Sequence, residues 1–438
     1  MKPIHVGLLG IGTVGGGTFA VLRRNQEEIT RRAGRGIVIT MVADKDLGRA
    51  RKLVGDAAEI TDDAAKVVCH PEIDIVIELI GGTKVAKDLI LAAIDNGKHV
   101  VTANKALLAT HGNEIFLAAQ KKGVMVAFEA AVAGGVPIIK ALREGLTANR
   151  IEWIAGIING TSNFILSEMR EKGSSFKDVL AEAQRLGYAE ADPTFDIEGV
   201  DAAHKLTIMA AIAYGIPMQF DKAYTEGISK LTREDIRYAE ELGYRIKLLG
   251  ITRRTAAGIE LRVHPTLIPS RRLIANVEGV MNAILVKGDA VGATLYYGAG
   301  AGAEPTASAV VADLVDVTRM HTADPEHRVP HLAFQPDRMS DTPILPMEEV
   351  ETSYYLRLRV LDRPGVLADI TRILADLSIS IDAMVQKEPS EGEEQVDIIM
   401  LTHLAQEKNI NAAIKRIESL PVVSGKVTRI RLEQLGRN

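Results

Sequence analysis

The chain has 438 residues, about two to three times the commonest domain size, and this length predicts more than one hydrophobic core. A content of 47% hydrophobic and 25% charged residues is ordinary for a soluble globular protein. The net charge of -5 disfavours a nucleic-acid partner and favours a small-molecule one. The single cysteine, Cys69, excludes an intrachain disulfide and a multi-thiolate metal site, which fits a reducing compartment.

The first residues, MKPIHVGLLG, enter a strand-like segment without the charged region and long apolar stretch of a secretion signal. No other stretch of the sequence reaches the length of a membrane span. We therefore expect a cytoplasmic protein without a membrane partner.

The first third of the chain alternates strand-like and helical patterns. An apolar run at residues 4–9 and a glycine cluster precede a helical pattern and a β-branched run at 36–43, which together predict a βαβ unit. The alternation continues with strands expected at 74–80, 99–102 and 124–129 and a helix at 85–96. This pattern predicts an α/β fold with a parallel sheet covered by helices on both faces.

The rest of the chain has a different order of strand-like and helical patterns. From Gly134 to about residue 297, helices separate strand-like stretches without strict alternation, which predicts an α+β domain. These strand-like stretches are 151–158, 259–265 and 283–288. Residues 331–350 are rich in proline and lack periodicity, as in a linker. Residues 351–438 follow the order strand, helix, strand, strand, helix, strand, which predicts a compact ferredoxin-like βαββαβ unit.

A glycine motif lies between the first strand and the first helix. It consists of Gly10, Ile11, Gly12, Thr13, Val14 and Gly15. Gly10 permits a tight turn, Gly12 lets the backbone approach a pyrophosphate, and Gly15 allows close packing of helix on strand. The amides at the helix N-terminus would bind the phosphates, so the motif predicts an NAD(P)-binding Rossmann domain. The alternative is a strand-to-helix turn that is merely tight.

The preference between the two dinucleotides stays open. Asp44, after the second strand, would hold the ribose 2′-hydroxyl of NAD(H), whereas Lys45 and Arg49 would hold the 2′-phosphate of NADP(H). These two cations would equally suit a solvated helix face.

Six motifs together resemble the homoserine dehydrogenase family, over roughly the first 330 residues. They are GIGTVG (10–15), TANKALLA (102–109), EAAVAGGVP (129–137), NGTSNFIL (159–166), GYAEADPTFDIEGVDAAHKL (187–206) and GAGAEPTASAVVADL (300–314). The tail, with DRPGVL at 362–367 between a strand and a helix, resembles the ACT family of amino-acid-binding domains.

The resemblance implies a domain order and an activity. We expect a Rossmann domain at 1–133, completed by the helix at about 305–325, a catalytic and dimerisation domain at 134–304, and an ACT domain at 351–438. The implied reaction is reversible reduction of L-aspartate 4-semialdehyde to L-homoserine in threonine, methionine and isoleucine biosynthesis.

Two lysines inside these motifs carry the expected chemistry. Hydride transfer to an aldehyde leaves an oxyanion that needs a proton, and a buried lysine can supply it because burial lowers its pKa. The resemblance gives Lys205 this role and places Lys105 where cofactor and substrate meet. Asp201 has the i, i+4 spacing that puts it on the same helical face as Lys205. On spacing alone, such a pair is more often a surface ion pair than a catalytic one.

The remaining expected site residues contact the substrate or the cofactor. The resemblance implies that Glu190 binds the substrate ammonium group and that Asp196 helps to orient the substrate. Gly302, before a helix, would offer amides to the substrate carboxylate or the cofactor, unless it is an ordinary glycine turn. Asn159 and Thr161 would line the substrate, although a capping turn explains them equally well. Thr102 is expected beside the cofactor, and His204 is expected to be structural.

A monovalent cation, most simply Na⁺, is also implied by the resemblance. Its ligands would be the Glu129 carboxylate and the main-chain carbonyls of Val132, Gly134 and Val136. The alternative is a glycine-rich crossover between domains that binds no ion.

ACT units generally pair through their sheets and bind an amino acid near the turn with the Pro-Gly step. We therefore expect feedback inhibition by threonine and a homodimer or homotetramer, with a purely oligomerising tail as the alternative.

Two other functions are alternatives to this reductase. An acylating semialdehyde dehydrogenase needs a catalytic cysteine, and Cys69 lies between the second and third strands instead. A sensing regulator has no need for two lysines beside a carboxylate cluster.

Overall fold

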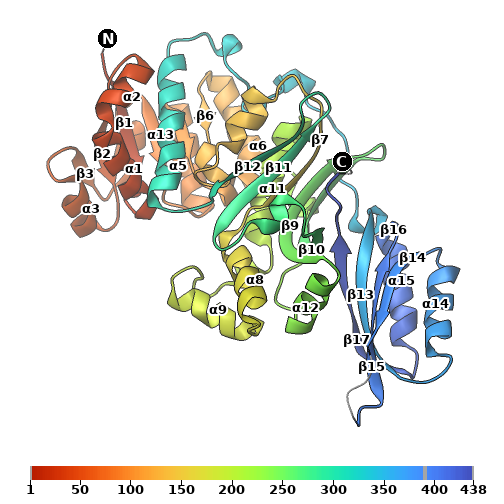
Figure 1. Cartoon of the computed structure of the whole chain (residues 1–438). Helices are drawn as coiled ribbons and strands as arrows, with labels where there is room; N and C mark the ends of the chain where they lie inside the picture. The colour runs from red at the N-terminus through yellow and green to blue at the C-terminus, as the bar shows by residue number, and fades with distance from the viewer. Residues whose placement is uncertain (1, 388–391, 437–438) are drawn as a thin grey trace. The chain divides into compact units, whose positions relative to one another are not determined.

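The computed structural model describes residues 2–387 and 392–436. The described chain folds into two compact units. Unit 1 consists of Met1–Gly160, Asp201–Ala223 and Val280–Thr342, and unit 2 of Thr161–Val200, Tyr224–Gly279 and Pro343–Asn438. Each unit is built from segments that are distant in the sequence (Figure 1).

Unit 1 begins with a parallel sheet of order β3-β2-β1-β4-β5-β6. Its strands are β1 (Ile4–Leu9), β2 (Ile37–Ala43), β3 (Glu59–Thr61), β4 (Ile75–Glu78), β5 (His99–Thr102) and β6 (Val126–Ala127). Its helices are α1 (Thr13–Arg24), α2 (Gln26–Ala33), α3 (Leu47–Val54), α4 (Ala64–Cys69), α5 (Lys84–Asp95) and α6 (Lys105–Lys122). Strands β4 and β5 are buried at every residue because helices cover both faces of the sheet.

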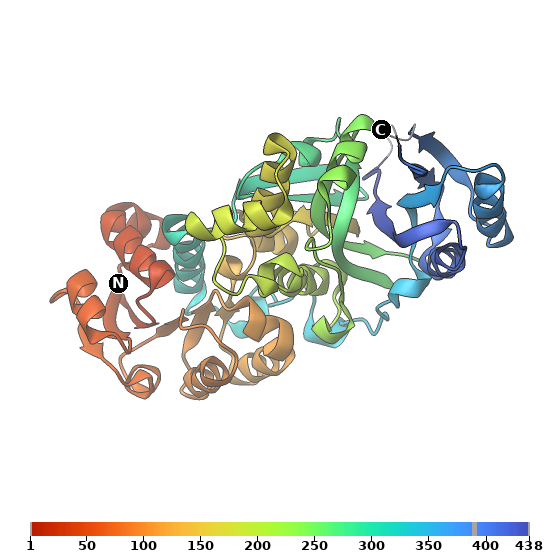
Figure 2. The ribbon, with the colours of Figure 1, turned by 90° about the horizontal axis from the view of Figure 1, so that it is seen from below.

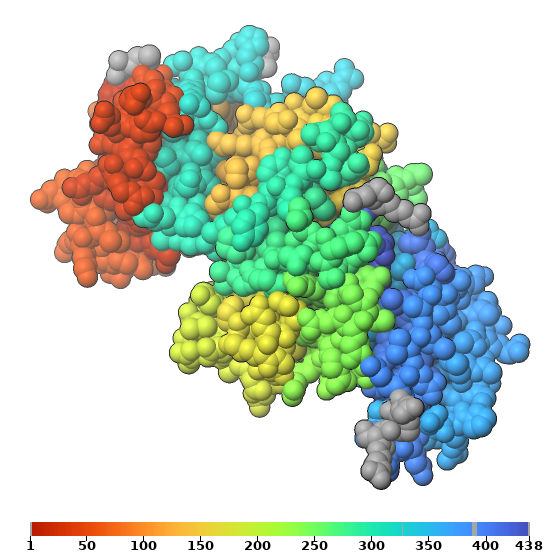
Figure 3. Space-filling model, in the orientation of Figure 1, coloured from red at the N-terminus to blue at the C-terminus, as the bar shows by residue number. Residues whose placement is uncertain are grey.

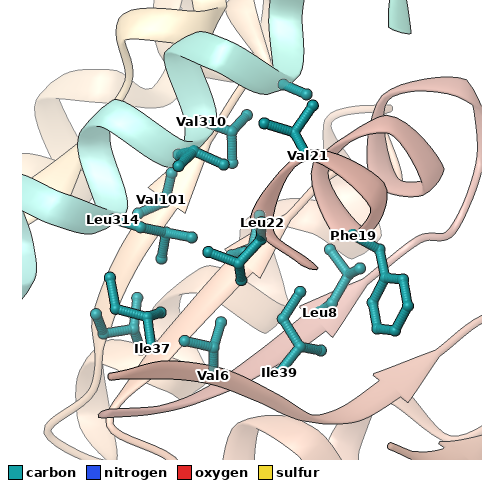
Figure 4. Close-up of a cluster of buried hydrophobic side chains, with 14 of the residues drawn as sticks. Val6, Leu8, Phe19, Val21, Leu22, Ile37, Ile39, Val101, Val310 and Leu314 are labelled. Atoms are coloured by element: carbon teal, nitrogen blue, oxygen red, sulfur yellow. The ribbon is translucent and has the colours of Figure 1, made fainter. Parts of the chain in front are cut away.

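A helix that follows much later in the sequence packs on the first helix of this domain. Helix α13 (Ala303–Met320) packs on α1. In Figure 4, Val310 and Leu314 of α13 lie beside Val21 and Leu22 of α1, above the sheet residue Ile37. This packing brings the glycine-rich turn before α13 into the same unit as the dinucleotide motif.

The rest of unit 1 contains an antiparallel sheet and a central helix. The strands β7 (Ile151–Ile157), β11 (Met281–Gly288) and β12 (Gly292–Ala299) pair in the order β7-β11-β12. Short helix α7 (Ile138–Lys140) precedes β7. Helix α11 (Val200–Tyr214) is buried from Asp201 onwards, so its polar side chains must find partners inside the protein.

Unit 2 combines a long hairpin with the C-terminal domain. The hairpin strands are β9 (Tyr244–Arg254) and β10 (Ile259–Pro269), and the short strand β8 (Tyr224–Thr225) pairs with β10. The helices are α8 (Gly160–Lys172), α9 (Phe176–Arg185), α10 (Thr194–Ile197) and α12 (Arg233–Glu241).

The C-terminal domain has the expected βαββαβ order. Its elements are β13 (Glu351–Leu361), α14 (Val366–Asp376), β14 (Ile381–Gln386), β15 (Gln395–Thr402), the short strand β16 (Ala405–Gln406), α15 (Glu407–Glu418) and β17 (Val423–Leu432). Helices α14 and α15 cover one face of its sheet in both views (Figures 1 and 2). Strand β17 also pairs in parallel with β10, at Thr266 with Arg431 and Leu267 with Leu432. In Figure 3, the surface of the hairpin (green) meets that of the C-terminal domain (blue).

The architecture matches the sequence-based expectation of a parallel α/β domain, an α+β part and a ferredoxin-like C-terminal unit. Strands β1 and β5 have the expected bounds, whereas the strand expected at 124–129 is shorter and gives way to a 3₁₀ turn at Glu129–Ala131. The sequence patterns did not predict β3, β8, β9 or β12.

Candidate active site

A buried ionic cluster lies in unit 1, where α11 meets the end of β7. The Lys205 ammonium group donates to Asp201 Oδ2 at 2.7 Å and to the Ile158 carbonyl at 2.8 Å. The Asn159 amide donates to the same Asp201 oxygen at 2.8 Å. Lys105, at the start of α6, lies 3.0 Å from Asp201 Oδ1. One carboxylate thus holds two lysines that are a hundred residues apart.

The cluster is sealed on one side and open on the other. The Asp201 and Lys205 side chains are 4% and 11% exposed, whereas Lys105 is 35% exposed. Burial opposes ionisation of Asp201, but the charges of Lys205 and Lys105 and the hydrogen bonds to its carboxylate hold its pKa well below the usual range. These contacts favour the ionised form of Asp201, whose carboxylate anchors both ammonium groups.

The loop before α6 is positioned by a carboxylate that sequence analysis missed. Glu78, fully buried at the end of β4, accepts hydrogen bonds from the Thr102 hydroxyl at 2.8 Å and from the Ile80 and Gly81 amides at 3.0 and 3.1 Å. Thr102 in turn accepts from the Asn104 amide, and the Asn104 side chain caps α6. This chain of hydrogen bonds fixes the helix terminus that carries Lys105.

Thr102, expected beside the cofactor, is itself fully buried with its hydroxyl on Glu78. Its side chain therefore stabilises the loop before α6. A cofactor could contact Thr102 through its main-chain atoms.

The glycine motif has the geometry that a pyrophosphate needs. Gly10 has φ +92°, a conformation that L side chains rarely adopt. A Cβ on Gly15 would lie 2.0 Å from the Gly10 carbonyl oxygen, whereas one on Gly12 would meet no atom within 4 Å. The space over Gly12 and the amides of Thr13 and Val14 at the start of α1 fit a dinucleotide phosphate.

Asp44 is engaged at the end of β2. Its Oδ2 accepts from the Ile11 amide at 2.7 Å and its Oδ1 from the Asp46 amide at 2.8 Å, while Arg49 lies 3.2 Å away. Burial opposes its ionisation, but these contacts lower its pKa below the usual value. Lys45 is exposed. The aspartate thus fixes the glycine turn and has its charge balanced by Arg49.

Gly302, with φ +130°, is the residue before α13. It therefore lies where the first amides of that helix begin, as expected.

The other expected substrate residues lie in unit 2. Glu190 is exposed and Asp196, on α10, is partly buried. The Thr161 hydroxyl donates to the Tyr188 carbonyl at 2.6 Å, and the Ser162 hydroxyl donates to the Asp196 carbonyl at 2.9 Å. These contacts tie the start of α8 to the loop that carries Glu190 and Asp196.

Glu129 lies in a second buried acidic region of unit 1. Its carboxylate accepts from the Ile139 and Lys140 amides at 2.9 and 2.8 Å, and its own amide donates to Asp313 at 2.8 Å. Burial and the charge of Asp313 raise the pKa of Glu129 to about 7, and burial raises that of Asp313 to about 6.

The loop that follows Glu129 contains the other expected cation ligands. Ala133 and Gly134 have φ values of +56° and +48°, which is strained for alanine. The Val136 carbonyl already accepts from the Ile138 amide at 2.8 Å, and its second lone pair remains for a cation. Two carboxylates with raised pKa values and a strained loop of carbonyls suit a hard cation. Among the described residues, no group of three or more His, Cys, Asp or Glu side chains forms a metal site.

Two further residues, His204 and Cys69, bear on the chemistry of the cluster. His204, beside Lys205 in sequence, packs against Phe220 with ring centroids 4.2 Å apart, and burial lowers its pKa to about 4. Burial therefore favours the neutral form of His204, and its structural role stays a prediction. Cys69 is exposed at the end of α4, so the cluster contains no thiol nucleophile.

The fold and the cluster define the class of protein: an NAD(P)-dependent oxidoreductase that carries an ACT domain. Three family descriptions match the chain, namely homoserine dehydrogenase over residues 137–315, the homoserine dehydrogenase NAD-binding domain over 10–129 and the ACT domain over 354–422.

Individual relatives agree over the full length. The chain is 67% identical to homoserine dehydrogenase of Pseudomonas aeruginosa, over 99% of this chain and 100% of the relative. The crystal structure of a homoserine dehydrogenase from Thiobacillus denitrificans superposes with a TM-score of 0.96 at 76% identity, over 100% of this chain and 99% of that one. A hyperthermophilic archaeal homoserine dehydrogenase in complex with NADPH gives 0.62 at 26% identity, over 72% of this chain and 98% of that one. The chain belongs to the homoserine dehydrogenase family.

In the described part of the chain, no helix is long and apolar enough to cross a membrane.

Proposed function

We propose that the chain catalyses the reversible NAD(P)H-dependent reduction of L-aspartate 4-semialdehyde to L-homoserine, in threonine, methionine and isoleucine biosynthesis. The observation that carries this proposal is the cluster in which Asp201 holds Lys205 and Lys105. A lysine in a water-poor site can give a proton to an alkoxide and take it back in the reverse reaction.

The bound dinucleotide supplies the hydride. Lys205 donates the proton to the developing alkoxide, while Asp201 and the Ile158 carbonyl hold its ammonium group in place. Lys105, on the more exposed side of Asp201, adds a second positive charge that stabilises the oxyanion. In this mechanism Asn159 acts on Asp201 rather than on the substrate.

The two ends of the substrate are held by groups of opposite charge. Glu190 binds the α-ammonium group, and Asp196 orients it. The amides after Gly302, at the start of α13, receive the carboxylate or the adjoining part of the dinucleotide. Thr161 acts through Tyr188, since its hydroxyl is hydrogen-bonded there.

The proposed cofactor is NADP(H) with substantial use of NAD(H). Arg49 balances Asp44, so the charge that would exclude a 2′-phosphate is neutralised. The structure of the archaeal homoserine dehydrogenase in complex with NADPH supports the same assignment.

A monovalent cation, most simply Na⁺, is proposed at Glu129 and the carbonyls of Val132, Gly134 and Val136. The raised pKa of Glu129 supports this proposal, since a cation would favour the ionised carboxylate that burial and Asp313 disfavour.

The C-terminal domain is proposed to bind threonine near the turn at 362–365 and to inhibit the enzyme. Gly365 in this turn has φ +93° and precedes α14. Pairing of C-terminal sheets would give a homodimer or homotetramer, and the enzyme would work in the cytoplasm.

Turnover of NADPH and NADH by the purified chain, with and without aspartate semialdehyde, tests this proposal. We expect oxidation that requires the semialdehyde and does not require coenzyme A or phosphate. Oxidation without the semialdehyde, or none with it, would refute the assignment. Threonine is then added to the active mixture to test for inhibition.

A further inference from the structure

Residues 190–199, here called the substrate loop, rest on a short segment at 224–228 in unit 2. The Ile228 amide donates to the Ile197 carbonyl at 2.9 Å. A Cβ on Gly227 would lie 2.5 Å from that carbonyl oxygen and 2.6 Å from Glu198 Cα, so the two backbones are in direct contact. Any shift of the 224–228 segment must therefore move the substrate loop.

The segment is attached to the long hairpin. The Glu226 amide donates to the Val263 carbonyl of β10 at 2.8 Å, and β8 continues this pairing at Tyr224. Its position is thus fixed by backbone contacts on two sides, to the loop and to the sheet.

The Glu226 side chain connects this segment to the last strand of the ACT domain. Its Oε2 accepts hydrogen bonds from Arg431 at 2.8 Å and Arg429 at 3.1 Å, both on β17, and from the Tyr224 hydroxyl at 2.7 Å. The Arg431 side chain is fully buried and those of Arg429 and Glu226 are 18% and 29% exposed. Solvent screens these ion pairs weakly, so removing one partner leaves the opposite charge poorly compensated.

The same arginines are anchored on the ACT side by Glu407, the first residue of α15. Arg431 donates to Glu407 Oε2 at 2.9 Å, and Arg429 donates to Glu407 Oε1 at 2.7 Å. The Tyr354 hydroxyl donates to Glu407 at 2.8 Å. Two arginines between two glutamates form a charge-balanced cluster that joins an ACT helix to the 224–228 segment.

We propose that Glu226 is a positioning residue through which strand β17 of the ACT domain holds the substrate loop and thereby sets the KM for homoserine. The inference rests on the proposed function, in which Glu190 and Asp196 of that loop bind the substrate. It gives the C-terminal domain a direct contact route to substrate affinity, because the two arginines of β17 and the loop contact the same five-residue segment.

The test compares Glu226→Gln with the matched control Glu234→Gln, an exposed glutamate on α12. For Glu226→Gln we expect the KM for homoserine to rise on the order of tenfold, with kcat and the dinucleotide KM nearly unchanged. Amide hydrogen exchange in residues 187–199 should also become faster. The control should change none of these quantities.

Arg429→Gln removes one of the two arginine contacts to Glu226 from the ACT side, and it serves if Glu226→Gln does not fold. Where both fold, the double variant should show less than the sum of the two single effects on KM, because each single variant already breaks the Arg429–Glu226 contact.

Unchanged exchange in the loop, an unchanged KM, or additive effects would overturn the inference. Failure of the proposed function has a different signature: the unaltered chain would then not oxidise homoserine at all. A chain that turns over homoserine but has a loop insensitive to Glu226 refutes only the positioning role.

Discussion

The ionisation of each carboxylate in the expected sites depends on its burial and on the groups around it. Asp201 is ionised because two lysines surround it, whereas Glu129 has its pKa raised to about 7 because it is buried beside Asp313. Glu190, by contrast, is exposed and free to bind a cationic ligand group. Burial and neighbours, rather than residue type, thus separate the three expected roles.

Glu190→Gln should raise the KM for homoserine far more than the KM for the dinucleotide, because the amide cannot form an ion pair with the substrate ammonium. Steady-state kinetics with each substrate varied in turn measures both. Glu182→Gln on α9 is the control, since it removes a local ion pair with Arg185 and no expected substrate contact. Equal changes in the two KM values would indicate a structural role for Glu190.

Glu129 predicts a pH-dependent response to Na⁺. Without a cation, the pKa of Glu129 is raised from 4.5 to about 7, so the folded state retains a proton that the unfolded state loses, and stability falls as pH rises between these values. A cation on the ionised carboxylate removes this loss. Replacing choline chloride with NaCl should therefore raise the Tm more at pH 8 than at pH 5.5.

Glu129→Gln should abolish this difference between the two salts. If the Tm of the unaltered chain responds equally to Na⁺ and choline at both pH values, the cation site is absent.

At the element scale, the sequence predicts best where a local pattern decides the structure. Strands β1 and β5 are apolar runs between glycine or polar residues, and the motif at Gly10 forms a turn of the expected kind. Contacts between distant segments have no such pattern. The pairing of β17 with β10, and the hydrogen bond of Thr102 to Glu78, therefore could not be predicted.

Part of the candidate site was also predictable. Asp201 and Lys205 share a helical face because of their spacing, and the structure joins them. The approach of Lys105 to the same carboxylate depends on how α6 and α11 pack, and no local signal encodes it.

The ion pair of Arg49 with Asp44, in the turn after β2, should influence the preference between NADPH and NADH. Since Arg49 balances Asp44, Arg49→Ala should lower kcat/KM for NADPH and leave or improve that for NADH, shifting the ratio by about tenfold. The control is Lys45→Ala, which removes an exposed neighbouring cation, whereas the ion pair with Asp44 in the described part of the chain is formed by Arg49. A strong NADH preference in the unaltered chain would show that Asp44 dominates the choice.

At the scale of the whole molecule, the ACT domain is part of the hairpin sheet rather than a detachable tail. The Arg262 guanidinium, 1% exposed on β10, donates to Glu433 at 2.5 Å and to Glu260 at 2.8 Å, and Arg253 lies 2.9 Å from Glu433. Removing one partner of a buried ion pair costs about 3–5 kcal/mol. Removing β17 also leaves an edge of β10 unpaired.

A chain that ends at Met347 should therefore lose threonine inhibition and melt at a lower temperature, while keeping turnover with a raised KM for homoserine. Its loss of the C-terminal sheet should also give a smaller oligomer on a sizing column. Glu433→Gln in the full chain separates the effects, because it should lower the Tm but keep the inhibition. Undiminished inhibition of the truncated chain by threonine would place the effector on the catalytic domain.

The kcat of Lys205→Ala, measured together with its dinucleotide Kd, tests whether Lys205 held by Asp201 is the proton donor. We predict a rate lower by ~10²–10⁴ with a nearly unchanged Kd, because the glycine motif that binds the pyrophosphate is built from other elements. A Lys205→Ala enzyme with near-normal kcat would contradict the account.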